Sequence, residues 1–149
     1  MTKELWFDMD GTIADLYGVE GWLDYLVNCN TYPYDEAAPL LNLSLLARYL
    51  NRLQKAGWRI GIVSWLSKSG SELYDGQVAF SKLCWLHVHM KSVQWDEIKI
   101  LPHGTNKYNA CGGGILFDDE EKNRAAAWDA AYEPDQIMEV LKELLRAEE

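Results

Sequence analysis

The chain has 149 residues, of which 48% are hydrophobic and 25% charged, which is the ordinary balance of a folded domain and excludes disordered and fibrous classes. Its length fits one domain with a core of its own. With 23 acidic and 14 basic side chains, the net charge is −9, which repels the phosphate backbone of duplex DNA or structured RNA. We therefore expect no duplex nucleic acid partner, although a small phosphorylated molecule can bind where the local charge differs.

The cysteines and apolar runs bear on the compartment. Cys29, Cys84 and Cys111 are odd in number and form no CxxC pair, which favours a reducing compartment over a disulfide framework. Residues 1–4 lead straight into an apolar run and do not have the pattern of a signal peptide. No apolar run approaches the ~18 residues of a membrane span. We expect a cytoplasmic protein without a membrane segment, as a monomer or homodimer.

The first half of the chain predicts two strands separated by an aromatic insert and a helix. Residues 5–7 form a compact apolar run typical of a buried strand. The segment at about 14–39 is rich in aromatic residues and broken by Gly and Pro, so we expect an insert with one short helix at 21–28. Leucines at helical spacing predict a helix over 40–56, and the apolar residues 58–63 predict the second strand.

The second half alternates helices and strands. A Ser/Gly-rich loop at 67–76 precedes a predicted helix over 77–90, with Phe80, Leu83, Cys84 and His87 as its apolar stripe. The remaining expected elements are strands at 97–101 and 115–117, a helix over 122–131, a short strand near 131–132 and a helix from 134. This alternation predicts an α/β fold: a three-layer, Rossmann-like parallel sheet with helices on both faces.

Polar side chains follow the predicted strands at the edge where parallel sheets bind ligands. They are Asp8 and Asp10 after the first strand, Ser64 after the second, Lys107 after the third, and Asp118 and Asp119 after the fourth. Clustered carboxylates raise one another's pKa, and a hard divalent cation such as Mg²⁺ removes that repulsion. The pattern predicts a magnesium site that binds a phosphate, with Lys107 neutralising phosphoryl charge and Ser64 donating a hydrogen bond.

Two carboxylates spaced as Asp8 and Asp10 can divide the chemistry of phosphate release. One attacks phosphorus and forms an aspartyl-phosphate. The other serves as acid for the leaving group and then as base for water. Two non-catalytic alternatives stay open. The pair at 118–119 is also typical of a helix cap, and Lys107 is also typical of a solvated lysine in a loop.

Aromatic residues near these strand ends are candidates for the substrate rim. Trp22 and Tyr25 in the insert, and Trp65 directly after Ser64, have the faces to stack on a base or to cover an apolar leaving group. A role in the core of the insert or of the main domain is an equally good interpretation of these side chains.

The sequence Asp8-Met9-Asp10-Gly11-Thr12 after an apolar strand resembles the first motif of the haloacid-dehalogenase-like (HAD) hydrolase superfamily. The segments 60–64 and 115–119 resemble its second and fourth motifs, and Lys107 resembles its third, in the family's order. Three further lysines compete for the third-motif position, namely Lys82, Lys91 and Lys99.

This resemblance implies a set of roles. Asp8 is the nucleophile and Asp10 the acid/base, while Mg²⁺ is held by the Asp8 carboxylate, the Asp10 carbonyl and Asp118, with support from Asp119. Within the superfamily the chain looks most like the 5′(3′)-deoxyribonucleotidase branch, which implies a (deoxy)nucleoside monophosphate. The insert at about 14–39 stands where those enzymes carry a larger cap.

We therefore expect a single catalytic domain over 1–149 that hydrolyses a small phosphorylated metabolite with the help of Mg²⁺. An alternative from another class is a low-turnover regulatory module that binds a phosphate or a phosphoprotein in the same crevice. A receiver-like domain, which also uses strand-end Asp, Ser/Thr and Lys, is the third possibility, but it lacks the Asp-x-Asp-Gly-Thr sequence.

Overall fold

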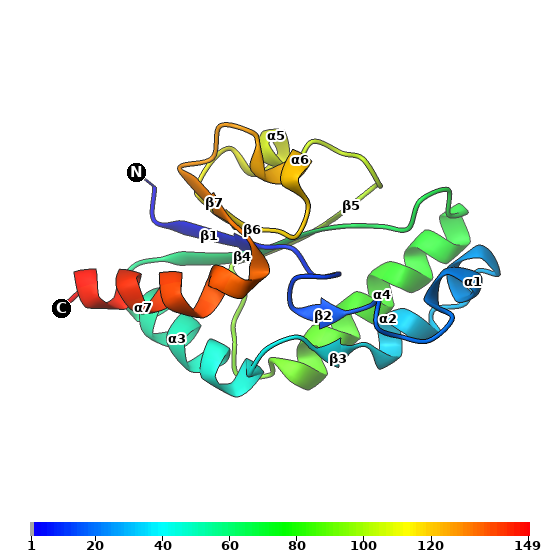
Figure 1. Cartoon of the computed structure of the whole chain (residues 1–149), viewed down its shortest axis with the longest axis horizontal. Helices are drawn as coiled ribbons and strands as arrows, with labels where there is room; N and C mark the ends of the chain where they lie inside the picture. Colours follow the sequence, from blue (N-terminus) through cyan, green and yellow to red (C-terminus); the bar gives the residue numbers. More distant parts are fainter. Residues whose placement is uncertain (1) are drawn as a thin grey trace.

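The computed structural model describes residues 2–149 and is built on a parallel sheet of five strands (Figure 1). Its strands are β1 (Glu4–Phe7), β4 (Arg59–Trp65), β5 (Glu97–Leu101), β6 (Ile115–Phe117) and β7 (Ala130–Tyr132). They lie in the order β5-β4-β1-β6-β7. Counted along the chain this is the 3-2-1-4-5 order of Rossmann-like folds, whereas receiver domains have the order 2-1-3-4-5. The topology therefore excludes the receiver-like alternative.

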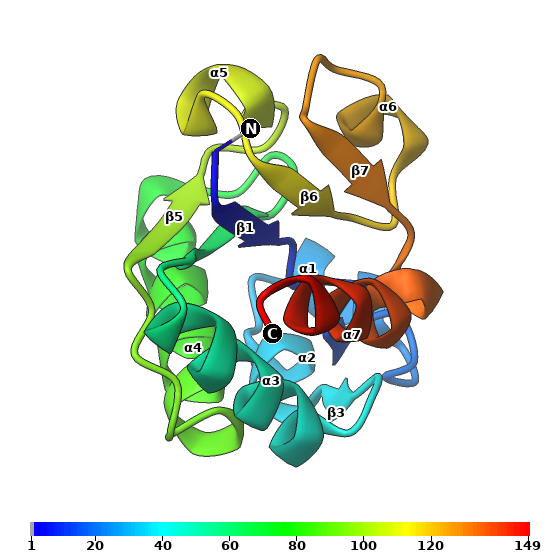
Figure 2. The same ribbon diagram turned by 90° about the vertical axis from the view of Figure 1, so that its left-hand side faces the viewer.

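Three long helices cover one face of the sheet and two short ones cover the other (Figure 2). The long helices are α3 (Leu43–Lys55), α4 (Glu72–His89) and α7 (Ile137–Ala147), the last preceded by a 3₁₀ turn, η1 (Pro134–Gln136). The short helices are α5 (Lys107–Cys111) and α6 (Glu121–Arg124). These three layers are the α/β architecture that the sequence predicts.

Strand alternation divides the buried side chains between two cores. Leu5 and Phe7 pack toward the long helices, and Trp6 packs toward the short ones. Gly61 pairs with Trp6 across β1 and β4, and a Cβ at this glycine would lie 2.4 Å from the indole ring. The glycine therefore lets the large indole lie flat on the sheet beneath the thin layer of short helices.

The insert begins and ends at a two-stranded antiparallel ribbon, β2 (Ala14–Asp15) with β3 (Ala38–Pro39). Between these strands lie α1 (Trp22–Val27), close to the predicted helix at 21–28, and α2 (Tyr32–Glu36). The sequence does not predict α2, because proline usually interrupts a helix. Pro33 lies in the first turn of α2, where proline is well tolerated. A small apolar core of Leu16, Tyr34, Tyr74 and Val78 joins the insert to α4.

The predicted stripe of α4 is wrong. The helix begins at Glu72, with the Ser71 hydroxyl accepting a hydrogen bond from the Tyr74 N–H, and not at 77. Its buried face consists of Tyr74, Val78, Ser81, Lys82, Trp85 and Leu86. The predicted stripe, Phe80, Leu83, Cys84 and His87, instead lies on the exposed face. Because apolar residues occur on both sides of this helix, periodicity alone does not select the buried one.

The predicted helix over 122–131 is also wrong beyond its first turn. Helix α6 ends at Arg124, and Ala130–Tyr132 forms β7, which confirms the short strand expected near 131–132. The alanines favour a helix, but Ala131 and Tyr132 pair with Leu116 and Phe117 of β6. Sheet pairing therefore overrides local helix propensity here.

No helix in residues 2–149 combines the length and the apolar character needed to cross a bilayer. The three cysteines are free thiols; Cys29 and Cys84 are exposed and Cys111 is half-buried. Burial raises the pKa of Cys111 to about 12, so this side chain stays in its protonated, unreactive form.

The two faces of α4 can be compared with a matched pair of leucines. Leu86 is buried in the main core, whereas Leu83 is exposed. We expect Leu86→Ala to lower the free energy of unfolding by about 2–5 kcal/mol and Leu83→Ala by less than about 0.5 kcal/mol. Urea denaturation of the dilute proteins measures both values, and equal losses would contradict the assignment of the buried face.

Candidate active site

The register of the central strands brings Asp8 and Asp118 together. Phe7 pairs with Phe117 across β1 and β6, so the next residue of each strand leaves the sheet at the same level. The Asp8 N–H donates to the Phe117 carbonyl at 2.9 Å. The strand order reverses between these two strands, which is where open α/β sheets bind their ligands.

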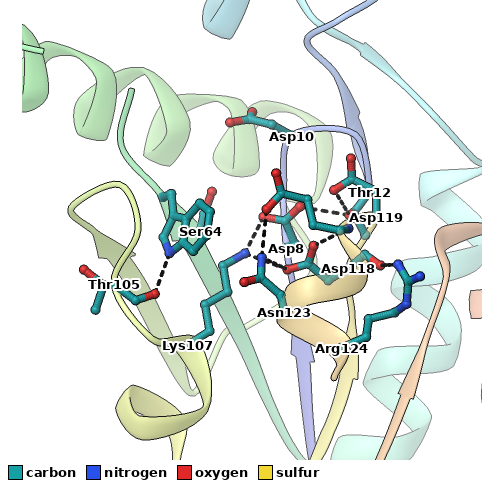
Figure 3. Close-up of polar contacts among 12 residues, drawn as sticks. Asp8, Asp10, Thr12, Ser64, Thr105, Lys107, Asp118, Asp119, Asn123 and Arg124 are labelled. Carbon is teal, nitrogen blue, oxygen red and sulfur yellow. Dashed lines mark hydrogen bonds and ion pairs between the residues drawn. The ribbon is translucent and has the colours of Figure 1, made fainter. Parts of the chain in front are cut away.

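Lys107 links the two carboxylates from the thin helical layer (Figure 3). It is the first residue of α5, and its Nζ donates to Asp8 Oδ1 at 2.9 Å and to Asp118 Oδ2 at 2.7 Å. Burial alone would lower the pKa of Lys107, but the charges of Asp8 and Asp118 raise it above its ordinary value. Lys107 is therefore a buried ammonium, not the solvated loop lysine of the alternative interpretation.

Asp119 completes a group of three carboxylates. Oxygen atoms of Asp8, Asp118 and Asp119 lie within 4.8 Å of one another. Thr12 Oγ1 donates to Asp8 Oδ2 at 3.0 Å. Gly11 has a φ of +79°, and a Cβ there would lie 2.4 Å from Asp119 Oδ2, so glycine is required both by the turn and by the approach of the carboxylate. Several hard oxygen donors in one place fit Mg²⁺.

The start of α6 orients Asp118. The Glu120 N–H donates to Asp118 Oδ1 at 2.9 Å, and Asn123 Nδ2 donates to Oδ2 at 3.2 Å. Arg124 donates to the Asp118 carbonyl at 2.9 Å. The carboxylate thus accepts hydrogen bonds on both oxygens and is held in one orientation. The sequence gives little sign of the contacts from Glu120 and Arg124, because they depend on a four-residue helix.

The carboxylates of the cluster are hard to ionise together. Burial, and then the charge of Asp8, raises the pKa of Asp118, while Lys107 acts in the opposite direction. The pKa of Asp119 is raised by the same two causes and by its hydrogen bond to Asp8. Such repulsion is what a bound cation relieves.

Asp10 points away from this cluster, toward α4 (Figure 3). Its Oδ2 accepts a hydrogen bond from Lys82 Nζ at 2.8 Å, and the same ammonium donates to Ser64 Oγ and to the Trp65 carbonyl, both at 2.7 Å. Burial raises the pKa of Asp10 and the charge of Lys82 opposes the rise. The side chain of Asp10 therefore does not join the three clustered carboxylates; the metal contact that the resemblance implies for Asp10 is made by its backbone carbonyl and stays a prediction.

Lys82, which the sequence offers only as a competitor for the third-motif position, belongs to the site through its contact with Asp10. Only 1% of its side chain is exposed, and its three ammonium protons are all used. A lysine between Val78 and Leu86 is a signal of burial once these residues are placed on the same face of α4. The predicted stripe lies on the opposite face of α4, so the pattern does not indicate that Lys82 is buried.

Ser64 is fully buried, and its hydroxyl oxygen accepts a hydrogen bond from Lys82. The structure brings it to Asp10 and Lys82, on the long-helix side of the sheet, and it does not line the pocket described next. The hydroxyl proton is not used in these contacts.

A pocket of about 470 Å³ opens beside the carboxylates. Asp8, Asp10, Lys107, Asp119 and Glu120 line its carboxylate end, the loop 67–70 and His103 add further polar groups, and the side formed by the insert is largely apolar. The apolar side chains from the insert are Leu16, Trp22, Leu23, Leu26, Val27 and Tyr34. The volume and the apolar lining are typical of sites for small molecules.

Two of the three predicted rim residues line this pocket. Trp22 lies in the insert wall, and Trp65 lies opposite it, where its Nε1 donates to the Thr105 carbonyl at 2.9 Å. The structure does not bring Tyr25 into the pocket; it lines a separate hollow and packs against Tyr32 with ring centroids 4.9 Å apart.

Comparisons with known proteins locate the fold. No known family model matches the chain, and no curated protein sequence matches it. Among solved structures, it is similar to D,D-heptose 1,7-bisphosphate phosphatase from Burkholderia thailandensis, with a TM-score of 0.57 and 15% identity over 97% of this chain and 99% of that one. At this identity the likeness shows the fold alone, an α/β fold with a Rossmann-like parallel sheet, as the sequence predicts.

Mg²⁺ should stabilise the protein most at high pH. Folding raises the pKa of Asp118 and Asp119, so above about pH 4 the folded state binds more protons than the unfolded state and stability falls as the pH rises. A cation held by the ionised cluster opposes this loss, by about 2.7 kcal/mol at a hundredfold excess over its dissociation constant. We expect Mg²⁺ to raise the melting temperature more near pH 8 than near pH 5.

Asp119→Asn should raise the melting temperature of the metal-free protein near pH 8 and weaken its response to Mg²⁺. Asp24→Asn, an exposed change on α1, is the matched control and should alter neither. A melting temperature that ignores Mg²⁺ at both pH values would contradict the metal site.

Removing the ammonium beside Asp10 should destabilise the fold in a pH-dependent way. Lys82→Met leaves the Asp10 carboxylate without its counter-ion, so we expect a loss of about 3–5 kcal/mol near pH 8. The loss should shrink near pH 4, because the pKa of Asp10 rises further and the neutral acid tolerates burial. Denaturant titrations at both pH values measure it, with the exposed Lys55→Met as control; equal losses at the two pH values would disprove the explanation.

Proposed function

We propose that this chain is a Mg²⁺-dependent phosphomonoester hydrolase that works through an aspartyl-phosphate. The observation that carries the proposal is the arrangement of Asp8, Lys107 and Asp118 at the reversal of the strand order, beside a pocket of small-molecule size. The likeness in fold to a phosphatase supports it. We take residues 1–149 as one catalytic domain with the insert at 14–39.

The charges at the site favour a divalent cation. When all four are ionised, the carboxylates of Asp8, Asp10, Asp118 and Asp119 face two buried ammonium groups, those of Lys82 and Lys107, which leaves an excess of two negative charges. Asp8, Asp118 and Asp119 would hold the ion. When bound, Mg²⁺ supplies positive charge that polarises a phosphoryl oxygen.

Asp8 is placed to be the nucleophile. Each of its carboxylate oxygens accepts one hydrogen bond, from Lys107 and from Thr12, so the group is fixed in orientation. One oxygen attacks phosphorus while the bond to the leaving oxygen breaks, which gives an acyl-phosphate on Asp8. The ammonium of Lys107 then balances charge on the transferring group.

Asp10 is proposed as the acid and base. It lines the pocket on the side away from Lys107, and burial raises its pKa, which favours a protonated acid that can give its proton to the leaving alkoxide. Once ionised, it can take a proton from the water that hydrolyses the acyl-phosphate. Lys82 stabilises this ionised form, so that Asp10 can act first as an acid and then as a base.

The pocket wall bears on the substrate class. The insert presents mainly apolar and aromatic side chains, including Trp22, and Trp65 lies on the facing side. This surface suits a flat or apolar group attached to the phosphate, and a (deoxy)nucleoside monophosphate is our first choice. The structural neighbour acts on a heptose bisphosphate; here the polar groups that could meet such a sugar lie outside the insert, at Ser67, Lys68, Ser69 and His103.

Phosphate release from a panel of nucleotides, sugar phosphates and phosphopeptides, with and without Mg²⁺, tests the proposal. We expect Mg²⁺-dependent turnover that Asp8→Asn lowers by at least about 10³-fold, because an amide cannot form the acyl-phosphate. Asp24→Asn, outside the pocket, should keep wild-type activity.

Two outcomes would overturn the phosphatase proposal. Turnover by Asp8→Asn at the wild-type rate would exclude Asp8 as nucleophile. Background activity of the wild type on the whole panel, together with Mg²⁺-dependent binding of a phosphopeptide, would instead favour the regulatory module.

A further inference from the structure

The exposed face of α4 differs from the exposed faces of the other long helices. Its exposed positions after Glu72 are Leu73, Gly76, Gln77, Phe80, Leu83, Cys84, His87 and Val88, with no acidic residue and no lysine or arginine among them. On α3 and α7 the exposed positions include Arg48, Arg52, Lys55, Glu139, Glu143 and Arg146. In a chain of net charge −9, an uncharged face along a solvent-facing helix calls for a physical cause.

The apolar side chains on this face are large and well exposed. Leu73 is 74% exposed, Phe80 68% and Val88 71%, and they follow one another along the same side of the helix. Figure 2 shows α4 at the edge of the helical layer, on the side away from α7. A continuous apolar stripe of this kind is typical of a surface that packs against another chain.

A glycine in the middle of this exposed face, Gly76, also indicates an outside partner. It lies inside α4, where glycine lowers helix stability relative to alanine. Apart from its own helix and its chain neighbours, no atom lies within 4 Å of the place that a Cβ would take. Nothing within the chain therefore requires the glycine, whereas a helix approaching from outside would use the notch that it leaves.

The spacing along the face is symmetric about Phe80. Counting outward from this residue, the notch at Gly76 on one side matches Cys84 on the other, and Leu73 matches His87. Two copies of α4 laid antiparallel about Phe80 would thus bring the two Phe80 side chains together and place the notch at Gly76 of each copy at the level of Cys84 of the other. A two-fold dimer interface requires this kind of self-complementary surface.

We propose that two copies of this chain associate through antiparallel α4 helices centred on Phe80. The exposed α4 side chains at the centre of the contact are uncharged, and an acidic group of the insert, Asp35, lines the hollow beside Gly76 and Phe80. At its two ends, Glu72 of one copy lies near the level of His87 and Lys91 of the other. The antiparallel arrangement also places the positive end of each helix dipole beside the negative end of the other. The inference does not depend on the proposed activity.

Sedimentation equilibrium over a concentration series tests the dimer. One helix pair buries less than the roughly 1,600 Å² of a standard interface, so we expect a dissociation constant in the micromolar range and a mass that rises toward twice 17.1 kDa. Phe80→Asp, which puts two like charges at the centre, should weaken association at least about tenfold. Its unchanged circular dichroism and melting temperature at low concentration would show that the fold is intact.

Leu40→Asp is the matched control, because Leu40 is an exposed leucine away from α4 and its change adds the same charge. It should associate like the wild type. A wild type that stays monomeric throughout the series, or a Phe80→Asp protein that associates as strongly as Leu40→Asp, would overturn the proposal.

Cross-linking tests the antiparallel direction. With Cys29→Ser as background, Gln77→Cys places a thiol within one residue of the level of Cys84 of the second copy, so copper–phenanthroline oxidation should give a covalent dimer. Arg48→Cys, on the exposed face of α3, should not. Equally fast cross-linking of the background protein through Cys84 alone would instead show parallel helices and overturn the antiparallel arrangement.

Discussion

The structure depends on how four carboxylates are held at one edge of a small sheet. Asp8 and Asp118 leave β1 and β6 at the same level, and Asp10 and Asp119 follow within two residues. Two buried lysines make this arrangement stable, and they come from opposite layers. Lys107 reaches Asp8 and Asp118 from the short helices, while Lys82 reaches Asp10 from α4. The two opposite approaches separate the carboxylates into two groups with different surroundings.

That separation gives the two aspartates of the first motif different chemistry. Asp8 shares an ammonium with Asp118 and lies among other carboxylates, so its ionised form suits a cation and a nucleophilic role. Asp10 is buried and pairs with the ammonium of Lys82. Burial raises its pKa and the charge of Lys82 lowers it, so these two opposing effects set its affinity for a proton. Two identical side chains two residues apart thus acquire different properties from the faces of the sheet that they reach.

Much of the fold and part of the site could be predicted from the sequence. The runs ending at Phe7 and Phe117 are short, apolar and followed by Asp, and these local signals fix the strands and the carboxylate pair. The burial of Lys82 could not be predicted, because α4 carries apolar residues on both sides. Which side is buried depends on the insert, which packs against Tyr74 and Val78. The failure over 122–131 has a similar cause, since only the edge of β6 makes Ala130–Tyr132 a strand. Tertiary partners decided each of these cases.

Helix α4 links the candidate active site to the proposed dimer interface. Its buried face carries Lys82 to Asp10 and packs against the insert that forms the pocket wall, while its other face is the uncharged stripe around Phe80. A lysine ammonium with three fixed acceptors is sensitive to small movements of the helix that carries it, because each hydrogen bond weakens steeply with misalignment. A second copy packed along α4 would restrain such movements. Association would then act on the Asp10 side of the site and leave the Asp8, Lys107 and Asp118 side, which is held by the other layer, unchanged.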